Sequence, residues 1–201
     1  MDYLQRYQQW LNDTAVDDET KKELLALQGN DEELKDRFYQ ELAFGTAGLR
    51  GKLGAGSNRM NSYIVARATH AFAKVISYYG EEFKQRGVAI SHDCRIKSDE
   101  FAKIAACTFA AHNIPVYLYE SLRSTPQLSF TVRHLHCAGG INITASHNPK
   151  DYNGYKVYWD EGSQIKDDIA NQIVQGSKSQ VTLFRVATAS RKNANYEGLP
   201  F

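Results

Sequence analysis

One stretch decides the fold. It reads VAISHDCRIKSDEFAKIAACTFAAHNIPVYLYESLRSTPQLSFTVRHLHCAGGINI and spans residues 88–143. Short apolar runs of strand length lie at 88–92, 114–119 and 138–143. The two longer segments between them, 98–113 and 126–135, are typical of helices, and the first opens with Ser-Asp-Glu. This β-α-β-α-β order predicts an α/β fold with a mixed, largely parallel sheet flanked by helices.

The segments on either side have a different character. Residues 1–42 predict helices, one over 17–27 and one that Asn30 caps. The glycine-dense stretch 44–60 predicts a loop or an irregular strand. A single long helix is expected over 61–84, a strand over 155–159 that returns as an antiparallel edge, and a last helix over 165–175.

Three parts follow from these patterns. Residues 1–42 form an N-terminal helical extension, and residues 43–176 form the α/β domain. Residues 177–201 have no clear helical period and form a divergent tail.

Composition excludes several classes of protein. The 201 residues are 42% hydrophobic and 23% charged, with a formal net charge of +1, so intrinsic disorder is excluded as the main state. No apolar run is long enough to span a membrane, and the polar start lacks the apolar core of a signal peptide. The near-neutral charge gives no reason to expect nucleic acid or a membrane surface as a partner. Three cysteines, far apart and odd in number, indicate reduced thiols in a cytoplasmic protein.

The loop after the third strand is the first place to look for chemistry, because ligands of such sheets bind beyond the carboxyl ends of the strands. It contains Ser146 and His147, and Lys156 follows ten residues after the serine. Arg50 lies in the glycine-rich segment. A hydroxyl nucleophile with cationic neighbours suits phosphoryl transfer, in which catalysis consists mainly of positioning and charge neutralisation.

Two other interpretations fit less well. A serine hydrolase needs a base oriented by a carboxylate, yet Gly-x-Ser-x-Gly is absent and His147 is poorly placed to act on its own neighbour. His92, His134 and His136 have no third ligand at a useful spacing, so we expect surface or hydrogen-bonded histidines and not a metal site.

Three motifs carry a resemblance to a known family. They are Thr144-Ala-Ser-His-Asn-Pro149 followed by Asn153-Gly-Tyr-Lys156, Phe44-Gly-Thr-Ala-Gly-Leu-Arg-Gly51 with Asn58-Arg-Met-Asn61, and Arg123-Ser-Thr-Pro126. These motifs resemble the first domain of the α-D-phosphohexomutases, the phosphoglucomutase and phosphomannomutase type of phospho-sugar mutase. The resemblance runs from about residue 41 to residue 175 and includes the branch that contains phosphopentomutases.

The resemblance implies a role for each site residue. Ser146 is expected to carry the phosphoryl group, with one phosphate oxygen on Mg²⁺, and Arg50 to hold the phosphate and the transition state. Lys156 and His147 are expected to assist proton transfer to or from the sugar hydroxyl. Asn148 and Thr144 are expected beside the phosphate or substrate.

The implied reaction interconverts hexose 1-phosphate and hexose 6-phosphate through a sugar bisphosphate, with an activator of the glucose 1,6-bisphosphate type. The substrate is a sugar phosphate, and the sequence does not indicate which one, or an oligomeric state.

The resemblance covers only the first of the family's four domains. The family's Asp-x-Asp-x-Asp-Arg metal loop is absent, because no Asp-x-Asp occurs in the sequence. The family's sugar-binding and phosphate-binding loops are also missing, so we expect a truncated chain with negligible mutase turnover alone. The alternatives are a non-catalytic binding or regulatory fragment, a phosphopentomutase and, least favoured, a serine hydrolase.

Overall fold

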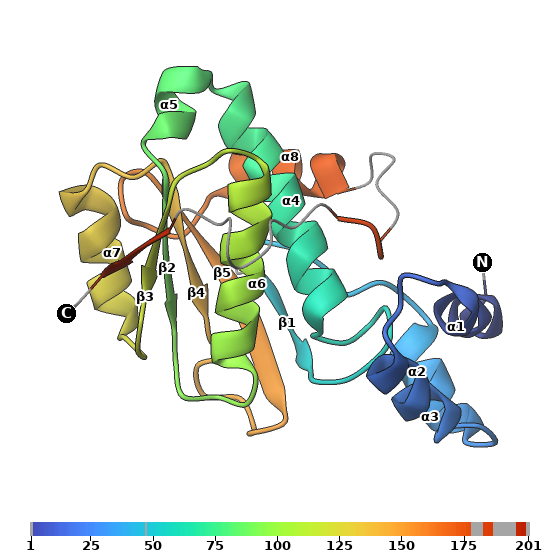
Figure 1. Cartoon of the computed structure of the whole chain (residues 1–201). Coiled ribbons are helices and arrows are strands. Elements are labelled where there is room, and N and C mark those ends of the chain that lie inside the picture. Colours follow the sequence, from blue (N-terminus) through green and yellow to red (C-terminus); the bar gives the residue numbers. More distant parts are fainter. Residues whose placement is uncertain (1, 47, 178–182, 187–195, 200–201) are drawn as a thin grey trace.

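The computed structural model describes residues 2–46, 48–177, 183–186 and 196–199. It contains an α/β/α sandwich and, beside it, a group of three N-terminal helices (Figure 1). Most of the tail 177–201 lies outside the described residues. No helix among the described residues is long and apolar enough to cross a membrane.

A mixed sheet forms the centre of the sandwich. Its strands are β1 (Leu49–Lys52), β2 (Val88–His92), β3 (Val116–Tyr119), β4 (Gly139–Ile143), β5 (Tyr152–Trp159) and β6 (Tyr196–Leu199). The strand order is β1-β5-β4-β2-β3-β6. Strands β4, β2, β3 and β6 run parallel to one another, whereas β5 is antiparallel to both β4 and β1. The predicted fold class is therefore confirmed.

Helices cover both faces of this sheet. They are α4 (Ser62–Tyr78), α6 (Ser98–Ala111), α7 (Thr125–His134) and α8 (Asp167–Ser177), whereas the short α5 (Glu81–Gln85) lies at one end of the sandwich (Figure 1). Two glycines of β4 show how closely the layers approach. A Cβ on Gly139 would lie 2.9 Å from the Phe72 ring of α4, and one on Gly140 would lie 2.7 Å from Val132 of α7. Helix α4 therefore packs on one face and α7 on the other.

The N-terminal helices α1 (Tyr3–Asn12), α2 (Asp18–Leu25) and α3 (Asp31–Phe38) enclose an apolar cluster of their own. Trp10 is at its centre, 2% exposed, and contacts Phe38, Tyr63 and Phe184 edge-to-face. Tyr63 belongs to α4, so the aromatic cluster joins the extension to the sandwich.

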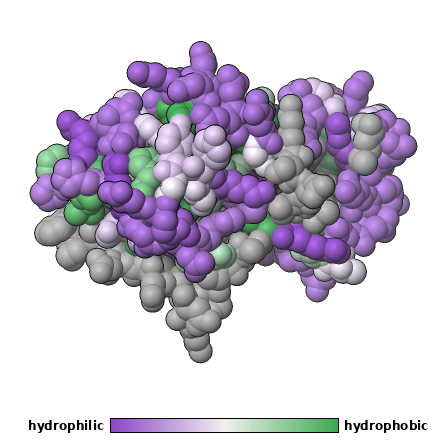
Figure 2. Space-filling model, turned by 90° about the horizontal axis from the view of Figure 1, so that it is seen from above, coloured by the Kyte–Doolittle hydropathy of each residue, from purple (hydrophilic) through white to green (hydrophobic). Residues whose placement is uncertain are grey.

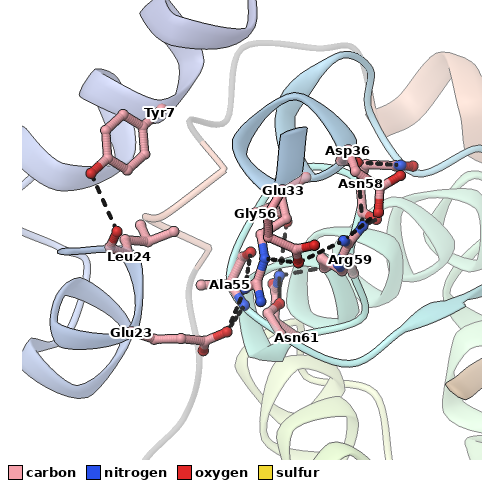
Figure 3. A network of polar contacts seen from close by, with 12 residues as sticks. Tyr7, Glu23, Leu24, Glu33, Asp36, Ala55, Gly56, Asn58, Arg59 and Asn61 are labelled. Carbon is pink, nitrogen blue, oxygen red and sulfur yellow. Dashed lines mark hydrogen bonds and ion pairs between the residues drawn. The ribbon is translucent and has the colours of Figure 1, made fainter. Parts of the chain in front are cut away.

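An ionic network makes a second connection between the extension and the sandwich (Figure 3). The buried Arg59 guanidinium, which follows β1, lies 2.6 Å from the Asp36 carboxylate and 3.2 Å from that of Glu33 on α3. Arg37 joins Glu33 to Glu23 of α2. The Glu23 carboxylate also accepts a hydrogen bond of 3.1 Å from the Ala55 amide, so charged groups of two helices hold the segment after β1.

The structure corrects two expectations and adds one strand. The helix expected over 61–84 is two helices, because Gly80 adopts φ +100° between α4 and α5, a conformation that only glycine enters freely. Strand β5 is antiparallel as expected but is not an edge, because β1 pairs with its outer side. The tail contributes β6, which pairs in parallel with β3 and which no sequence pattern indicated.

The end of the sandwich on which α5 lies is viewed directly in Figure 2. Hydrophilic residues cover most of this face, with only small hydrophobic areas between them. Since β2 begins just after α5, this is the amino end of the parallel strands. The candidate site lies at the opposite, carboxyl end.

Candidate functional site

Ser146 lies in the loop that joins β4 to β5, and its side chain is exposed. Its backbone has φ +55°, in the left-handed region that a serine rarely occupies. The Thr144 hydroxyl accepts a hydrogen bond of 3.0 Å from the Ser146 amide and supports this turn. Strain of this kind persists only where the surroundings impose it, so the contacts of the loop hold Ser146 in this conformation.

Arg50 approaches the serine loop from β1. Its position pairs with Gly154 of β5, and its guanidinium Nη1 donates to the Asn148 side-chain oxygen at 3.0 Å. The sheet topology thus brings together two segments that lie far apart in the sequence. The exposed guanidinium lies at the loop that carries Ser146.

Lys156 extends from β5, opposite Asn142 of β4. Burial lowers the pKa of its ammonium group below the ordinary value, the positive charge of Arg50 lowers it further, and the negative charge of Asp93 acts in the opposite sense. The surroundings of Lys156 therefore disfavour its charged form relative to a lysine in water.

His147 is exposed, and its Nδ1 lies 3.5 Å from the Ser146 hydroxyl, at the outer limit of a hydrogen bond. Among the contacts of the described residues, no carboxylate orients this ring. The arrangement lacks the third member of a hydrolase triad.

The loop after β2 contributes groups that the sequence analysis did not assign to the site. Asp93 accepts hydrogen bonds from the Ser98 hydroxyl at 2.7 Å and from the Arg95 amide at 2.9 Å. The fully buried Asn153 donates to Ser98 Oγ at 3.0 Å. Arg95 contacts the backbone of the serine loop. The sequence could have indicated Asp93 and Arg95 by their position. Charged residues that directly follow the strand at 88–92 lie at the same edge of the sheet as Ser146.

The third motif of the resemblance lies at this edge as well. The Arg123 amide donates to the carbonyl oxygen of His92, at the carboxyl end of β2, with a bond of 3.0 Å. The loop of residues 123–126 therefore borders the same end of the sheet as Ser146.

The chemistry of the donors does not fit a Mg²⁺ site. No group of three or more His, Cys, Asp or Glu side chains that could hold a metal ion occurs among the described residues. The charged side chains nearest the serine loop are mainly cationic, and the Asp93 carboxylate is engaged by Arg95 and Ser98. A phosphate on Ser146 would offer oxygen ligands, but Mg²⁺ also prefers carboxylates.

His92 ends β2, whereas His134 and His136 lie at and just after the end of α7. His92 is buried, with Nδ1 2.9 Å from the Asp93 carbonyl oxygen, whereas His134 is exposed and stacks on Phe130. His136 has φ +53° in the turn after α7.

This chain is similar in sequence and in fold to known proteins. A family model described as "Phosphoglucomutase/phosphomannomutase, alpha/beta/alpha domain I" matches residues 41–182. Phosphopentomutase from Homo sapiens is 45% identical over 165 residues, which cover 78% of this chain and 27% of that protein. Phosphoglucomutase from Staphylococcus epidermidis is 45% identical over 142 residues, which cover 71% of this chain and 26% of that protein.

Among solved structures, a "putative phosphomannomutase" from Thermus thermophilus superposes with a TM-score of 0.67 at 30% identity. The match covers 80% of this chain and 33% of that chain. The chain thus spans about a quarter of the length of the curated relatives it matches.

Proposed function

Because the chain belongs to the phosphoglucomutase/phosphomannomutase domain I family, we propose that it supplies the phosphoserine part of a phospho-sugar mutase site. Ser146 gives the phosphoryl group to a sugar monophosphate and takes another back from the bisphosphate. One observation supports this most: an exposed, left-handed Ser146 lies in a loop that contacts the Arg50 guanidinium. In this proposal the helical extension is 1–42, the catalytic domain 43–176 and the tail 177–201.

The chemistry assigned to each residue follows from its surroundings. As the sugar hydroxyl attacks phosphorus, the bond from phosphorus to Ser146 Oγ breaks. Lys156 and His147 assist the transfer of the hydroxyl proton, and Ser146 Oγ takes up a proton as it leaves and becomes a hydroxyl again. The Arg50 charge stabilises the negative charge that develops on the phosphoryl oxygens. Thr144 holds the turn at Ser146 through its hydroxyl, and Asn148 holds the Arg50 guanidinium through its side-chain oxygen.

Mg²⁺ and a sugar bisphosphate activator are included in the proposal only because the chain belongs to this family. When bound, the ion would neutralise phosphate charge. No step here depends on it, because the donor set of the described residues does not fit it.

Phosphopentose is the second candidate substrate. The phosphopentomutase and the phosphoglucomutase above are both 45% identical to this chain, so similarity does not separate the two sugars. The proposed test therefore uses both.

The test is phosphoryl loading of the purified chain. We expect incubation with glucose 1,6-bisphosphate or ribose 1,5-bisphosphate, each with Mg²⁺, to add one phosphoryl group to Ser146, as read by intact and peptide mass spectrometry. Ser146→Ala should abolish the gain, and Ser124→Ala, an exposed serine at the same sheet edge, should keep it. No gain with either donor, or an equal gain in Ser146→Ala, would refute the assignment.

Turnover is a separate measurement. In a coupled assay of glucose 1-phosphate conversion to glucose 6-phosphate, we expect negligible activity from the chain alone. Robust turnover that depends on Ser146 would instead show that this chain orients the sugar unaided. If the chain is a regulatory fragment, neither loading nor turnover will depend on Ser146.

A further inference from the structure

The Arg95 side chain reaches from the loop after β2 into the serine loop. Its Nη2 donates to the carbonyl oxygens of Ser146 at 2.8 Å and Asn148 at 2.6 Å. Its Nη1 donates to those of Pro149 at 2.8 Å and Tyr152 at 3.0 Å. One guanidinium therefore holds three carbonyls of the serine loop and the carbonyl of the first residue of β5.

The remaining nitrogen of Arg95 has a partner as well. Nε lies 3.4 Å from Asp93 Oδ2, and the other carboxylate oxygen of Asp93 is held by Ser98. A guanidinium has five N–H donors in one plane, and here every nitrogen faces an oxygen. The two Nη nitrogens of Arg95 are therefore engaged by backbone oxygens, whereas the Arg50 side chain is exposed.

The backbone of the serine loop explains why these contacts matter. A loop outside the sheet ladder leaves carbonyl groups that need donors, and Arg95 supplies donors to those of Ser146 and Asn148 while its side chain is only 13% exposed. The bonds begin at Ser146, the residue held at φ +55°. The loop after β2 is itself fixed to β4, because the Asp93 amide donates to the Ile143 carbonyl oxygen at 3.1 Å.

We propose that Arg95 is the positioning residue of the serine loop: its guanidinium holds the backbone from residue 146 to residue 152, so that the Ser146 hydroxyl is presented to the phosphoryl donor. This inference rests on the proposed function for the identity of the reaction. The holding of the loop itself does not depend on that reaction.

The experiment compares Arg95→Ala and Arg95→Lys with a matched control, Arg86→Ala. Arg86 also binds two backbone carbonyls, those of His136 and Cys137, and a carboxylate, Asp160, but at the opposite end of the sheet. Loss of such bonds costs stability in both proteins, whereas only Arg95 is connected to Ser146.

The first readout is the rate of phosphoryl loading from glucose 1,6-bisphosphate. We expect Arg95→Ala to load at least tenfold more slowly, because a small displacement of a reacting group has large effects on rate. Millimolar guanidinium ion should restore part of the rate. Arg95→Lys, which keeps the charge but cannot span four carbonyls, should stay slow, and Arg86→Ala should load within twofold of the parent. Loading of Arg95→Ala at the parental rate, or equal slowing in Arg86→Ala, overturns the proposal.

The second readout is amide hydrogen exchange over residues 144–154. We expect faster exchange in both Arg95 variants and not in Arg86→Ala. Unchanged exchange in the Arg95 variants overturns the proposal. If Arg95→Ala is too unstable to assay, Arg95→Lys provides the same measurement. If the parent takes up no phosphoryl group, the proposed function fails, and the exchange data still decide whether Arg95 holds the loop.

Discussion

Arg50 and Asn148 are 98 residues apart in sequence, and a side-chain hydrogen bond of 3.0 Å joins them across the end of the sheet. The contact exists because β1 adds antiparallel to β5, which places Arg50 opposite Gly154. A Cβ on Gly154 would lie 2.6 Å from the Thr144 carbonyl oxygen, so only glycine lets β1, β5 and the serine loop approach this closely. The site thus depends on a long-range pairing.

The same arrangement gives a prediction for Lys156. Arg50→Gln removes a positive charge that lowers the pKa of Lys156, so that pKa should rise. It should remain below the ordinary lysine value, because burial is the larger cause and persists. The measurement is a titration of the Lys156 ¹³Cε chemical shift. Arg123→Gln, at the same edge of the sheet, is the control, and a fall or no change of the pKa in Arg50→Gln would contradict the prediction.

The left-handed conformation of Ser146 should lower the free energy of unfolding of the chain. A non-glycine residue in the left-handed region costs about 1 kcal/mol, which glycine avoids. Ser146→Gly should therefore raise the free energy of unfolding by roughly 0.5–1 kcal/mol while it removes the hydroxyl. Urea denaturation is the measurement.

The matched control is Ser124→Gly, at a position with φ −72° and no side-chain capping bond. There glycine relieves no strain and should lower stability by a few tenths of a kcal/mol. If the two variants change stability in the same direction, the loop stores no strain at Ser146.

The alternation of strands and helices over residues 88–143 was predictable from sequence, because local apolar periodicity reports both the elements and the sheet edge they share. It was enough to place Ser146 in an exposed loop at the carboxyl end. The contacts of Arg95 were not predictable, since they join a side chain to backbone carbonyls whose position depends on the path of a loop. The break at Gly80 was missed because apolar spacing continues from α4 towards Phe83.

The network around Arg59 should stabilise the packing of the N-terminal helices. Arg59→Met leaves the carboxylates of Glu33 and Asp36 without this partner, but both are partly solvated. We therefore expect a loss of about 2 kcal/mol, less than for a fully buried pair. Hydrogen exchange should accelerate in α1–α3 more than in β2 and β4.

Lys103→Met tests whether any lost ion pair has this effect. Lys103 pairs with Asp99 on the exposed surface of α6, and such pairs contribute less than about 1 kcal/mol. A loss in Arg59→Met no larger than in Lys103→Met, or one spread evenly over the sheet, would rule out the network as the specific link between the two parts.

The last prediction concerns a histidine pair between α4 and α6. His70 is 8% exposed, its Nδ1 lies 2.8 Å from His112 Nε2, and its own Nε2 is buried without a partner among the described contacts. Burial, with the nearby charges of His112 and Lys74, lowers the pKa of His70 to about 4. Burial also lowers the pKa of His112.

The sign of the effect follows from proton uptake. Between pH 6.5 and 4 the unfolded chain binds a proton at His70 that the folded chain does not, so stability is full above pH 6.5 and is lost as pH falls. At ~1.4 kcal/mol per pKa unit the loss approaches roughly 3 kcal/mol. His70→Gln keeps a hydrogen-bonding group but does not titrate, so its free energy of unfolding should vary less over this range. His134→Gln, at an exposed ring, should keep the parental slope. Equal slopes in all three proteins would show that His70 does not contribute to destabilisation by acid.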